Sequence, residues 1–379
     1  MNKRSDIIKN TKRCIIKIGS ALLTSNGKGL DVEAINDWVK QLASIKQSGV
    51  EIVLVSSGSV AEGMSRMGWD KRPKTLHELQ AAAAIGQAGL IQTYQHNFEQ
   101  HQLQTAQILL THDDLSNRQR YLNARSTLRT LLKLNTIPIV NENDTVALEE
   151  IRLGDNDTLA AMVANLVDAD LLIILTDQDG LYDKDPRKSA DAKLISLDSA
   201  SNETLLGFAG SAGTNIGTGG MRTKVLAAQS AARSGCDTII AAGTESNILA
   251  RIMEGEALGT LLTADCEPIK ARKQWISHQT NIMGQLTIDS GAESALLKGG
   301  RSLLPVGVNH VDGDFKRGDI VNCVNSEGVL VCRGVINYPS KECRKIQGLA
   351  STDIVNHLGY IDESELIHRD NLVVLVSVD

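Results

Sequence analysis

The sequence predicts an α/β protein: a mainly parallel open sheet with helices on both faces, followed by a small β-rich C-terminal domain. Three observations predict it. Short apolar runs alternate with helical stretches as far as about residue 265. These runs are apolar at nearly every position, as in strands covered on both faces. Beyond about residue 270, short β-like runs are separated by Gly and Asp. A chain of 379 residues favours two domains, which we expect at 1–265 and 271–379.

The individual elements follow from the same patterns. Strands of the first domain are expected at Cys14–Gly19, Glu51–Ser57, Gln107–Thr111, Ile137–Val140, Leu171–Asp177 and Asp237–Gly243. Helices are expected around three apolar stripes: Val32–Ile45 after the cap Asp31, Leu128–Leu132, and Leu159–Leu166 after Asp155-Asn156-Asp157. The β-like runs of the second domain are Leu286–Ile288, Ser302–Val308, Asp319–Asn325, Val329–Val335 and Leu372–Val376. Strand–helix–strand alternation of this length implies parallel pairing, with small-molecule sites beyond the carboxyl ends of the strands.

Composition excludes several classes of protein. The chain has 39 Lys plus Arg, 45 Asp plus Glu and a net charge of −6, which argues against a phosphate backbone or an anionic membrane as main partner. It has no apolar run of membrane-helix length, and its first residues lack the apolar stretch of a signal peptide, so we expect a cytoplasmic protein. The six cysteines are scattered without a CxxC pair, which favours reduced thiols over disulfides or a zinc site.

Two candidate site clusters follow the first two strands. Lys17, beside Gly19, lies inside an apolar run, where its ammonium group requires a partner unless it lies at an edge and reaches solvent. Ser56-Ser57-Gly58-Ser59 ends the next strand. Small hydroxyl groups and a glycine at this turn suit contacts to an anion, although a plain helix cap has the same composition.

Two further clusters come later in the chain. Asn141-Glu142-Asn143-Asp144, with Gly154-Asp155-Asn156-Asp157 after it, gathers carboxylates and amides that would attract a lysine, a metal or a substrate ammonium group, unless it is a solvated acidic turn. The segment Thr214–Lys224 is a glycine-rich stretch leading into a helix, where backbone N–H groups can face phosphate oxygens. Its spacing differs from the GxxxxGK[ST] loop, and a flexible Gly/Thr loop would look the same.

Together these clusters indicate phosphoryl transfer without a side-chain nucleophile. The sequence has no GxSxG or HExxH motif and no Cys/His pair at catalytic spacing. A carboxylate acceptor with a pKa of about 4.3 is ionised at pH 7 and needs no general base. Such an enzyme has only to align the acceptor and neutralise the charge that develops on the phosphoryl group, which lysines and Mg²⁺ can do.

The order of the motifs resembles the glutamate 5-kinase family of the amino-acid kinase superfamily. The matching segments are KIGS, LVSSGSVAEG, PIVNENDTV, GDNDTLAAMVA, LLIILTDQDGLYDKDP and GTGGMRTK. The later stretches KQWI, DSGAESALLKGGRSLLPVGV and FKRGDIV resemble a PUA domain. The resemblance implies the amino-acid kinase fold with a PUA domain, and ATP-dependent phosphorylation of the γ-carboxylate of L-glutamate to γ-glutamyl phosphate, the first step of proline biosynthesis.

The resemblance also implies roles for particular residues. Lys17 and Lys224 would contact the ATP phosphates and act in catalysis, with Asp157 holding both lysines by charge pairing. Ser57, Asp144 and Asn156 would bind glutamate, with Asp144 the partner of its α-ammonium group. The nucleotide would also contact Thr176, Asp177, Thr218, Gly219, Gly220, Met221, Arg222 and Thr223. Mg²⁺ would be held mainly by the nucleotide phosphates, and no protein ligand is assigned to it. Ser20 and Arg222 depart from the family's usual Thr and Ser.

Partners and alternatives complete the expectations. The resemblance implies feedback inhibition by proline, a homo-oligomer and functional coupling to glutamyl phosphate reductase. The alternatives are another amino-acid kinase, of the acetylglutamate kinase, aspartokinase or uridylate kinase type, and an RNA-binding regulator acting through the PUA domain. Residues 271–379 carry 11 Lys plus Arg against 13 Asp plus Glu, a net charge of −2 that argues against RNA as the main partner.

Overall fold

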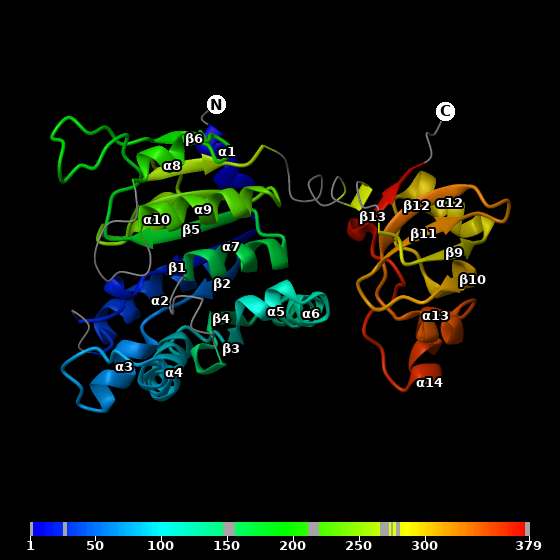
Figure 1. Cartoon of the computed structure of the whole chain (residues 1–379), viewed down its shortest axis with the longest axis horizontal. Helices are drawn as coiled ribbons and strands as arrows, with labels where there is room; N and C mark the ends of the chain where they lie inside the picture. The colour runs from blue at the N-terminus through cyan, green and yellow to red at the C-terminus, as the bar shows by residue number, and fades with distance from the viewer. Residues whose placement is uncertain are drawn as a thin grey trace. The chain divides into compact units, whose positions relative to one another are not determined.

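The structure is a computed structural model that describes residues 3–25, 29–146, 156–210, 220–265, 273, 276–277 and 281–375. The chain divides into two compact units, Met1–Pro268 and Ile269–Asp379 (Figure 1). No helix within the described residues combines the length and the apolar character needed to cross a membrane.

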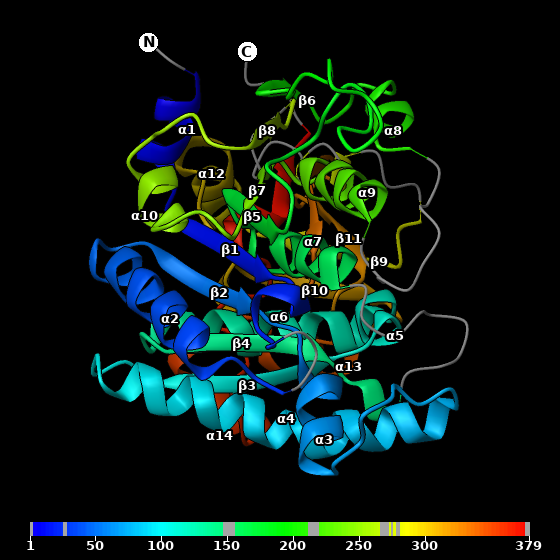
Figure 2. The same cartoon turned by 90° about the vertical axis from the view of Figure 1, so that its left-hand side faces the viewer.

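A single sheet forms the centre of the first unit. Its strands are β1 (Arg13–Ile18), β2 (Glu51–Val55), β3 (Thr105–Leu110), β4 (Ile137–Glu142), β5 (Leu171–Thr176), β6 (Leu197–Ser199), β7 (Asp237–Ala242) and β8 (Thr260–Thr263). Within the described residues their order is β3-β4-β2-β1-β5-β7-β8-β6, and all neighbours are parallel except β7 and β8 (Figure 2). The prediction of a mainly parallel sheet is therefore confirmed, as are its six strands. The sequence did not reveal β6 and β8, which are too short to carry a pattern.

Helices cover both faces of this sheet, as the sequence predicts. The helices of this unit are α1 (Lys3–Asn10), α2 (Val32–Gln47), α3 (Ser59–Arg66), α4 (Leu76–Glu99), α5 (His112–Ser116), α6 (Arg118–Lys133), α7 (Asn156–Val167), α8 (Leu205–Phe208), α9 (Met221–Ala232) and α10 (Ile248–Met253). Two short 3₁₀ turns are Ser20–Leu22 and Asp144–Val146. The predicted cap Asp31 is confirmed, because its side chain accepts a hydrogen bond from the backbone N–H of Ala34.

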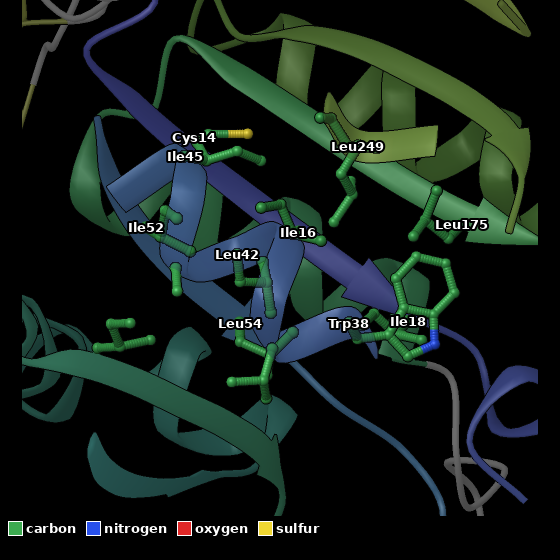
Figure 3. Close-up of a cluster of buried hydrophobic side chains, with 14 of the residues drawn as sticks. Cys14, Ile16, Ile18, Trp38, Leu42, Ile45, Ile52, Leu54, Leu175 and Leu249 are labelled. Atoms are coloured by element: carbon green, nitrogen blue, oxygen red, sulfur yellow. The ribbon is translucent and has the colours of Figure 1, made fainter. Parts of the chain in front are cut away.

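Successive residues of the central strands enter two separate hydrophobic cores. Cys14, Ile16 and Ile18 of β1 pack in one core with α2, α4 and α10, and Figure 3 shows part of it around Trp38 and Leu42. Ile15 faces the opposite side, in the core formed with α6, α7 and α9. Because side chains alternate along a strand, Lys17 lies on the same face as Ile15. The period of the strand therefore directs the lysine toward α7 and α9.

Helices α3 and α4 cross at a distance that only glycine permits. A Cβ atom on Gly86 would lie 1.8 Å from the carbonyl oxygen of Ser59, and one on Gly63 would lie 1.8 Å from that of Ala82. The clash in each case is with backbone, which cannot turn aside. This close crossing fixes the position of Ser59, whose side chain contacts Asp144.

Replacement of Gly86 by alanine is therefore expected to force the two helices apart and to lower the free energy of unfolding by about 1–3 kcal/mol. Thermal unfolding followed by circular dichroism measures the effect. Gly207→Ala is the matched control, because a Cβ atom there would meet nothing within 4 Å. A Gly86→Ala protein as stable as this control would show that the crossing is wider than described.

The second unit contains its own sheet and core. The strands β9 (Gly284–Ile288), β10 (Val308–Gly313), β11 (Ile320–Val324), β12 (Leu330–Val335) and β13 (Leu372–Val374) are ordered β10-β9-β11-β12-β13 within the described residues. Neighbours are antiparallel except β9 and β11. Its helices include α12 (Ser290–Gly299), α13 (Ser340–Ile346) and α14 (Ile354–Leu358), with 3₁₀ turns at Pro305–Gly307, Ser351–Asp353 and Arg369–Asn371.

Four of the five β-like runs predicted in this unit coincide with strands, and the fifth was wrong. Residues 305–307 of the run Ser302–Val308 form a 3₁₀ turn, and the strand begins only at Val308. Pro305 opens the turn because its ring fixes φ near the helical value and it has no N–H group to give to a ladder. Three cysteines of this unit, Cys323, Cys332 and Cys343, are buried as free thiols.

Candidate active site

The polar clusters of the sequence meet at the carboxyl ends of four adjacent parallel strands. β4, β2, β1 and β5 lie side by side in this order (Figure 2). Lys17 lies near the end of β1, Ser56 follows β2, Asn141 lies near the end of β4, and Thr176 ends β5. Since parallel strands bring their carboxyl ends to one edge, residues far apart in sequence become neighbours here.

Two lysines share one carboxylate at this edge. The Nζ atom of Lys17 lies 2.6 Å from Oδ1 of Asp157, and the Nζ atom of Lys224 lies 2.9 Å from Oδ2. The hydroxyl group of Thr223 also donates to Oδ2, at 3.0 Å. Asp157 lies in the first turn of α7 and Lys224 in the first turn of α9, and all three charged side chains are buried. The charge pairing predicted for Asp157 is therefore present, while the catalytic roles of the three residues stay predictions.

The carboxylate of this buried ion cluster is ionised. Burial alone would raise the pKa of Asp157, but the two lysines outweigh it and hold the pKa below the ordinary carboxyl value. The carboxylate is thus ionised and pairs with both ammonium groups. Two ammonium groups held side by side in this way could attract an anion such as a phosphate group. The alternative of an edge lysine is wrong, because β1 is a central strand and only 6% of Lys17 is exposed.

A second cluster joins the ends of β2, β4 and α7 through one side-chain amide. Nδ2 of Asn156 donates to the carbonyl oxygen of Ser56 at 2.6 Å, to Oγ of Ser57 at 2.9 Å and to Oδ1 of Asn141 at 3.0 Å. Ser57 does not cap α3, whose N-cap is Gly58 with φ 104° and without a side-chain hydrogen bond. The structure therefore brings Ser57 and Asn156 together, and the alternative of a plain cap is wrong.

Asp144 lies beside this cluster in a buried acidic environment. Its Oδ2 accepts a hydrogen bond from Oγ of Ser59 at 3.3 Å. Burial first, and the neighbouring carboxylate of Glu142 second, raise the pKa of Asp144 to about 7, against the smaller effects of Ser59 and Arg72. Asp144 and Glu142 are each only 8% exposed, so the alternative of a solvated acidic turn is wrong.

A cavity opens at Asp144. Its volume is about 260 Å³, and it is bounded by one face of α4, by β3 and by the turn after β4. The polar residues of its lining are Gln87, Gln107, Glu142, Asn143, Asp144 and Thr145. A small ligand with a cationic group would find its counter-charge in the two carboxylates of this cavity.

Sequence reasoning missed Gln87 as a residue of the site. Gln87 lies on α4 and is buried, and its Oε1 accepts a hydrogen bond from Nδ2 of Asn141 at 2.8 Å. No local motif marks it, since it stands in an alanine-rich helix. The one available signal was a glutamine among the buried residues of α4, most of which are small or apolar, as Ala83 and Leu90 are.

The residues predicted to contact the nucleotide are described in part. Thr176 is buried and donates from its hydroxyl group to Oδ1 of Asp177, which is exposed. Gly220 is the N-cap of α9 and supplies no side-chain cap, and its carbonyl oxygen accepts a hydrogen bond from the backbone N–H of Thr223. Met221, exposed Arg222 and Thr223 form that first turn. Thr218, Gly219 and Asp155 lie outside the described residues.

Comparison with known proteins identifies the family. The model of the "Amino acid kinase family" matches residues 12–242, and the model of the "PUA domain" matches residues 284–358. Curated glutamate 5-kinases align over nearly the whole chain. The chain belongs to the glutamate 5-kinases of the amino acid kinase family.

Three of these glutamate 5-kinases illustrate the similarity. The protein from Thioalkalivibrio sulfidiphilus is 58% identical over 99% of this chain and 100% of its own length. The proteins from Nitrosospira multiformis and Azoarcus sp. are 56% and 58% identical, each over 97% of this chain and 99% of their own length. The amino acid kinase model spans the Lys17–Asp157–Lys224 cluster, and membership in the glutamate 5-kinases extends to the PUA part of the chain.

Proposed function

We propose that the chain transfers the terminal phosphoryl group of ATP to the γ-carboxylate of L-glutamate. The carboxylate oxygen forms a bond to the γ-phosphorus while the bond from that phosphorus to the β,γ-bridging oxygen breaks, which gives γ-glutamyl phosphate and ADP. In the glutamate 5-kinases this is the first step of proline biosynthesis. The observation that carries the proposal is the pair of buried lysines on Asp157, in a chain that aligns end to end with glutamate 5-kinases.

The geometry supplies charge and position, and the substrate supplies the nucleophile. A γ-carboxylate with a pKa of about 4.3 is ionised at neutral pH. Lys17 and Lys224 would stabilise the charge that develops on the phosphoryl oxygens, and Asp157 holds both ammonium groups in place before the substrate arrives. The N-terminus of α9 adds backbone N–H groups for the phosphates of ATP.

Mg²⁺ belongs to the proposal as an ion carried mainly by the nucleotide. The described residues contain no group of three His, Cys, Asp or Glu side chains arranged to hold a metal. Both oxygens of Asp157 lie against lysines. This donor set fits an ion bound through phosphate oxygens, where it would neutralise part of their charge.

The residues of the glutamate pocket and the further partners of the chain also belong to this proposal. Asp144 would pair with the α-ammonium group of glutamate, and Ser57 and Asn156 would complete the substrate pocket. Feedback inhibition by proline, a homo-oligomer, a cytoplasmic location and coupling to glutamyl phosphate reductase follow from the family resemblance.

Measurement of ADP release with four acceptors tests the function. L-Glutamate, N-acetylglutamate, aspartate and UMP are compared at equal concentrations, with ATP and Mg²⁺ in excess. We expect turnover with L-glutamate to exceed turnover with each of the others. Faster turnover with N-acetylglutamate, aspartate or UMP would instead place the chain's activity with another amino-acid kinase.

The pH dependence of glutamate use should follow the ionisation of Asp144. Only the deprotonated carboxylate pairs with an ammonium group, and its pKa in the free protein is about 7. The value of kcat/KM for glutamate should therefore rise by up to about tenfold per pH unit below this value and level off above it. Asp144→Asn should lower kcat/KM and abolish this inflection, while Asp114→Asn, on α5, should keep it. An inflection that persists in Asp144→Asn would assign it to another group.

A further inference from the structure

We propose that Gln87 is a further substrate-binding residue whose amide Nε2 group donates to the α-carboxylate of glutamate. The inference rests on the proposed function. It assigns the second charged group of the substrate, since Asp144 accounts only for the ammonium group. Gln87 lies on α4 and lines the 260 Å³ cavity together with Asp144.

Two backbone groups fix the orientation of the Gln87 amide, because a backbone N–H can only donate a hydrogen bond and a backbone carbonyl oxygen can only accept one. The backbone N–H of Glu142 donates to Oδ1 of Asn141 at 2.9 Å, so the Nδ2 group of Asn141 must point the other way. It points at Gln87 and donates to its Oε1 at 2.8 Å. At the far end, the carbonyl oxygen of Ser56 fixes Nδ2 of Asn156 as a donor. The row of amides therefore has one direction, and Oε1 of Gln87 is the acceptor in it.

The same row leaves the Nε2 group of Gln87 without an acceptor. Only 8% of the residue is exposed, and Nε2 has no hydrogen-bond partner among the described residues. A buried donor that makes no hydrogen bond is unfavourable, because it has lost its contact with water and gained no acceptor in return. A donor held in this state beside a cavity indicates a ligand that supplies the acceptor.

The charges in the lining of the cavity indicate which group of the ligand accepts the hydrogen bond from Nε2 of Gln87. The carboxylates of Glu142 and Asp144 attract an ammonium group, and Gln87, whose buried Nε2 is a donor without an acceptor, belongs to the same lining. A free α-amino acid carries an ammonium group and a carboxylate on neighbouring atoms. Its ammonium group would lie at Asp144 and its α-carboxylate at Gln87, with the γ-carboxylate left for the phosphoryl group.

A different role for Gln87 would be to hold Asn141 alone. Gln87→Glu separates the two roles, because the glutamate side chain keeps an oxygen for Nδ2 of Asn141 and replaces the donor by a second oxygen. A substrate α-carboxylate would then meet an anion, whereas the α-amide of glutamate would present N–H groups to it. The α-amide retains both the ammonium group and the γ-carboxylate of the substrate.

The experiment measures kcat/KM for L-glutamate and for its α-amide with the full chain at pH 8.5. In Gln87→Glu, the preference for glutamate over the α-amide should fall at least about tenfold relative to the unmodified chain. Both acceptors are compared in one preparation, so incomplete folding of the variant cancels in the ratio. Gln92→Glu is the matched control, since it introduces the same charge at an exposed position of the same helix, outside the lining of the cavity, and should change the ratio less than about twofold.

Each outcome separates this inference from the proposed function. The contact is overturned if the ratio of kcat/KM for glutamate to kcat/KM for the α-amide is as large in Gln87→Glu as in the unmodified chain. Where the unmodified chain gives no measurable turnover with the α-amide, the lower limit of its ratio takes the place of the measured value. An equal fall in Gln92→Glu also overturns the contact, because a general effect of the added charge would then explain the change. If the unmodified chain does not phosphorylate L-glutamate, the proposed function itself fails.

Discussion

Replacement of Lys17 or Lys224 by alanine is expected to lower kcat by about 10²–10³-fold while the protein stays folded. Each lysine would meet the phosphoryl group as charge develops on it, so its loss acts mainly on kcat. Asp157 keeps the other lysine in either variant and is not left as an unpaired buried charge. The measurement is kcat with glutamate and ATP both saturating, together with the thermal midpoint.

Lys46→Ala is the matched control for this experiment. Lys46 is also a buried lysine, but it lies in the last turn of α2, near Glu51 at the start of β2, away from the carboxyl ends of the strands. Its loss should leave kcat within about twofold, as expected for a group that never contacts the transition state. Normal turnover in both Lys17→Ala and Lys224→Ala would remove the two lysines from the reaction.

Replacement of Asp157 by asparagine should have the largest effect on stability. The change removes the carboxylate that lies between two buried ammonium groups, and the loss of one partner of a buried ion pair costs about 3–5 kcal/mol. Because the pKa of Asp157 is lowered in the folded state, the ionised pair stabilises the protein above the ordinary carboxyl pKa. This contribution disappears as the pH falls through the lowered value, so the unmodified chain should lose the advantage over Asp157→Asn in acid.

A double variant provides the control for the charge argument. Asp157→Asn combined with Lys224→Met removes one of the two repelling cations and should recover part of the lost stability, as a double-mutant cycle would show. Urea unfolding at neutral pH measures the four proteins of the cycle, which are the unmodified chain, the two single variants and the double variant. An Asp157→Asn protein as stable as the unmodified chain would mean that the ion cluster contributes nothing to the free energy of unfolding.

The central strands could be predicted because their residues are apolar at nearly every position. Leu171–Thr176 is buried at each position, and such a run has few alternatives to a strand covered on both faces. Lys17 could be singled out for the same reason, since a charge in the apolar run Cys14–Gly19 requires a partner. The partner itself, Asp157, is distant in sequence, and it was assigned from the family resemblance before the structure gave the distance of 2.6 Å.

The long helix α4 and its role could not be predicted from its sequence. Leu76–Glu99 is rich in alanine and glycine, and its buried and exposed faces differ little in hydrophobicity. Gly86 is in this helix because α3 crosses it, and Gln87 is buried because Asn141 donates to it. Both reasons depend on residues from other elements, so the sequence pattern of α4 alone could not reveal them.

Trapping the product with hydroxylamine tests the central claim most directly. An acyl phosphate reacts with hydroxylamine to give a hydroxamate, and mass spectrometry of its fragments shows which carboxyl group of glutamate was activated. With ATP, Mg²⁺ and L-glutamate, we predict γ-glutamyl hydroxamate, formed in step with ADP and lost in Lys17→Ala. An α-hydroxamate, or ADP released without any hydroxamate, would contradict the transfer of a phosphoryl group to the γ-carboxylate.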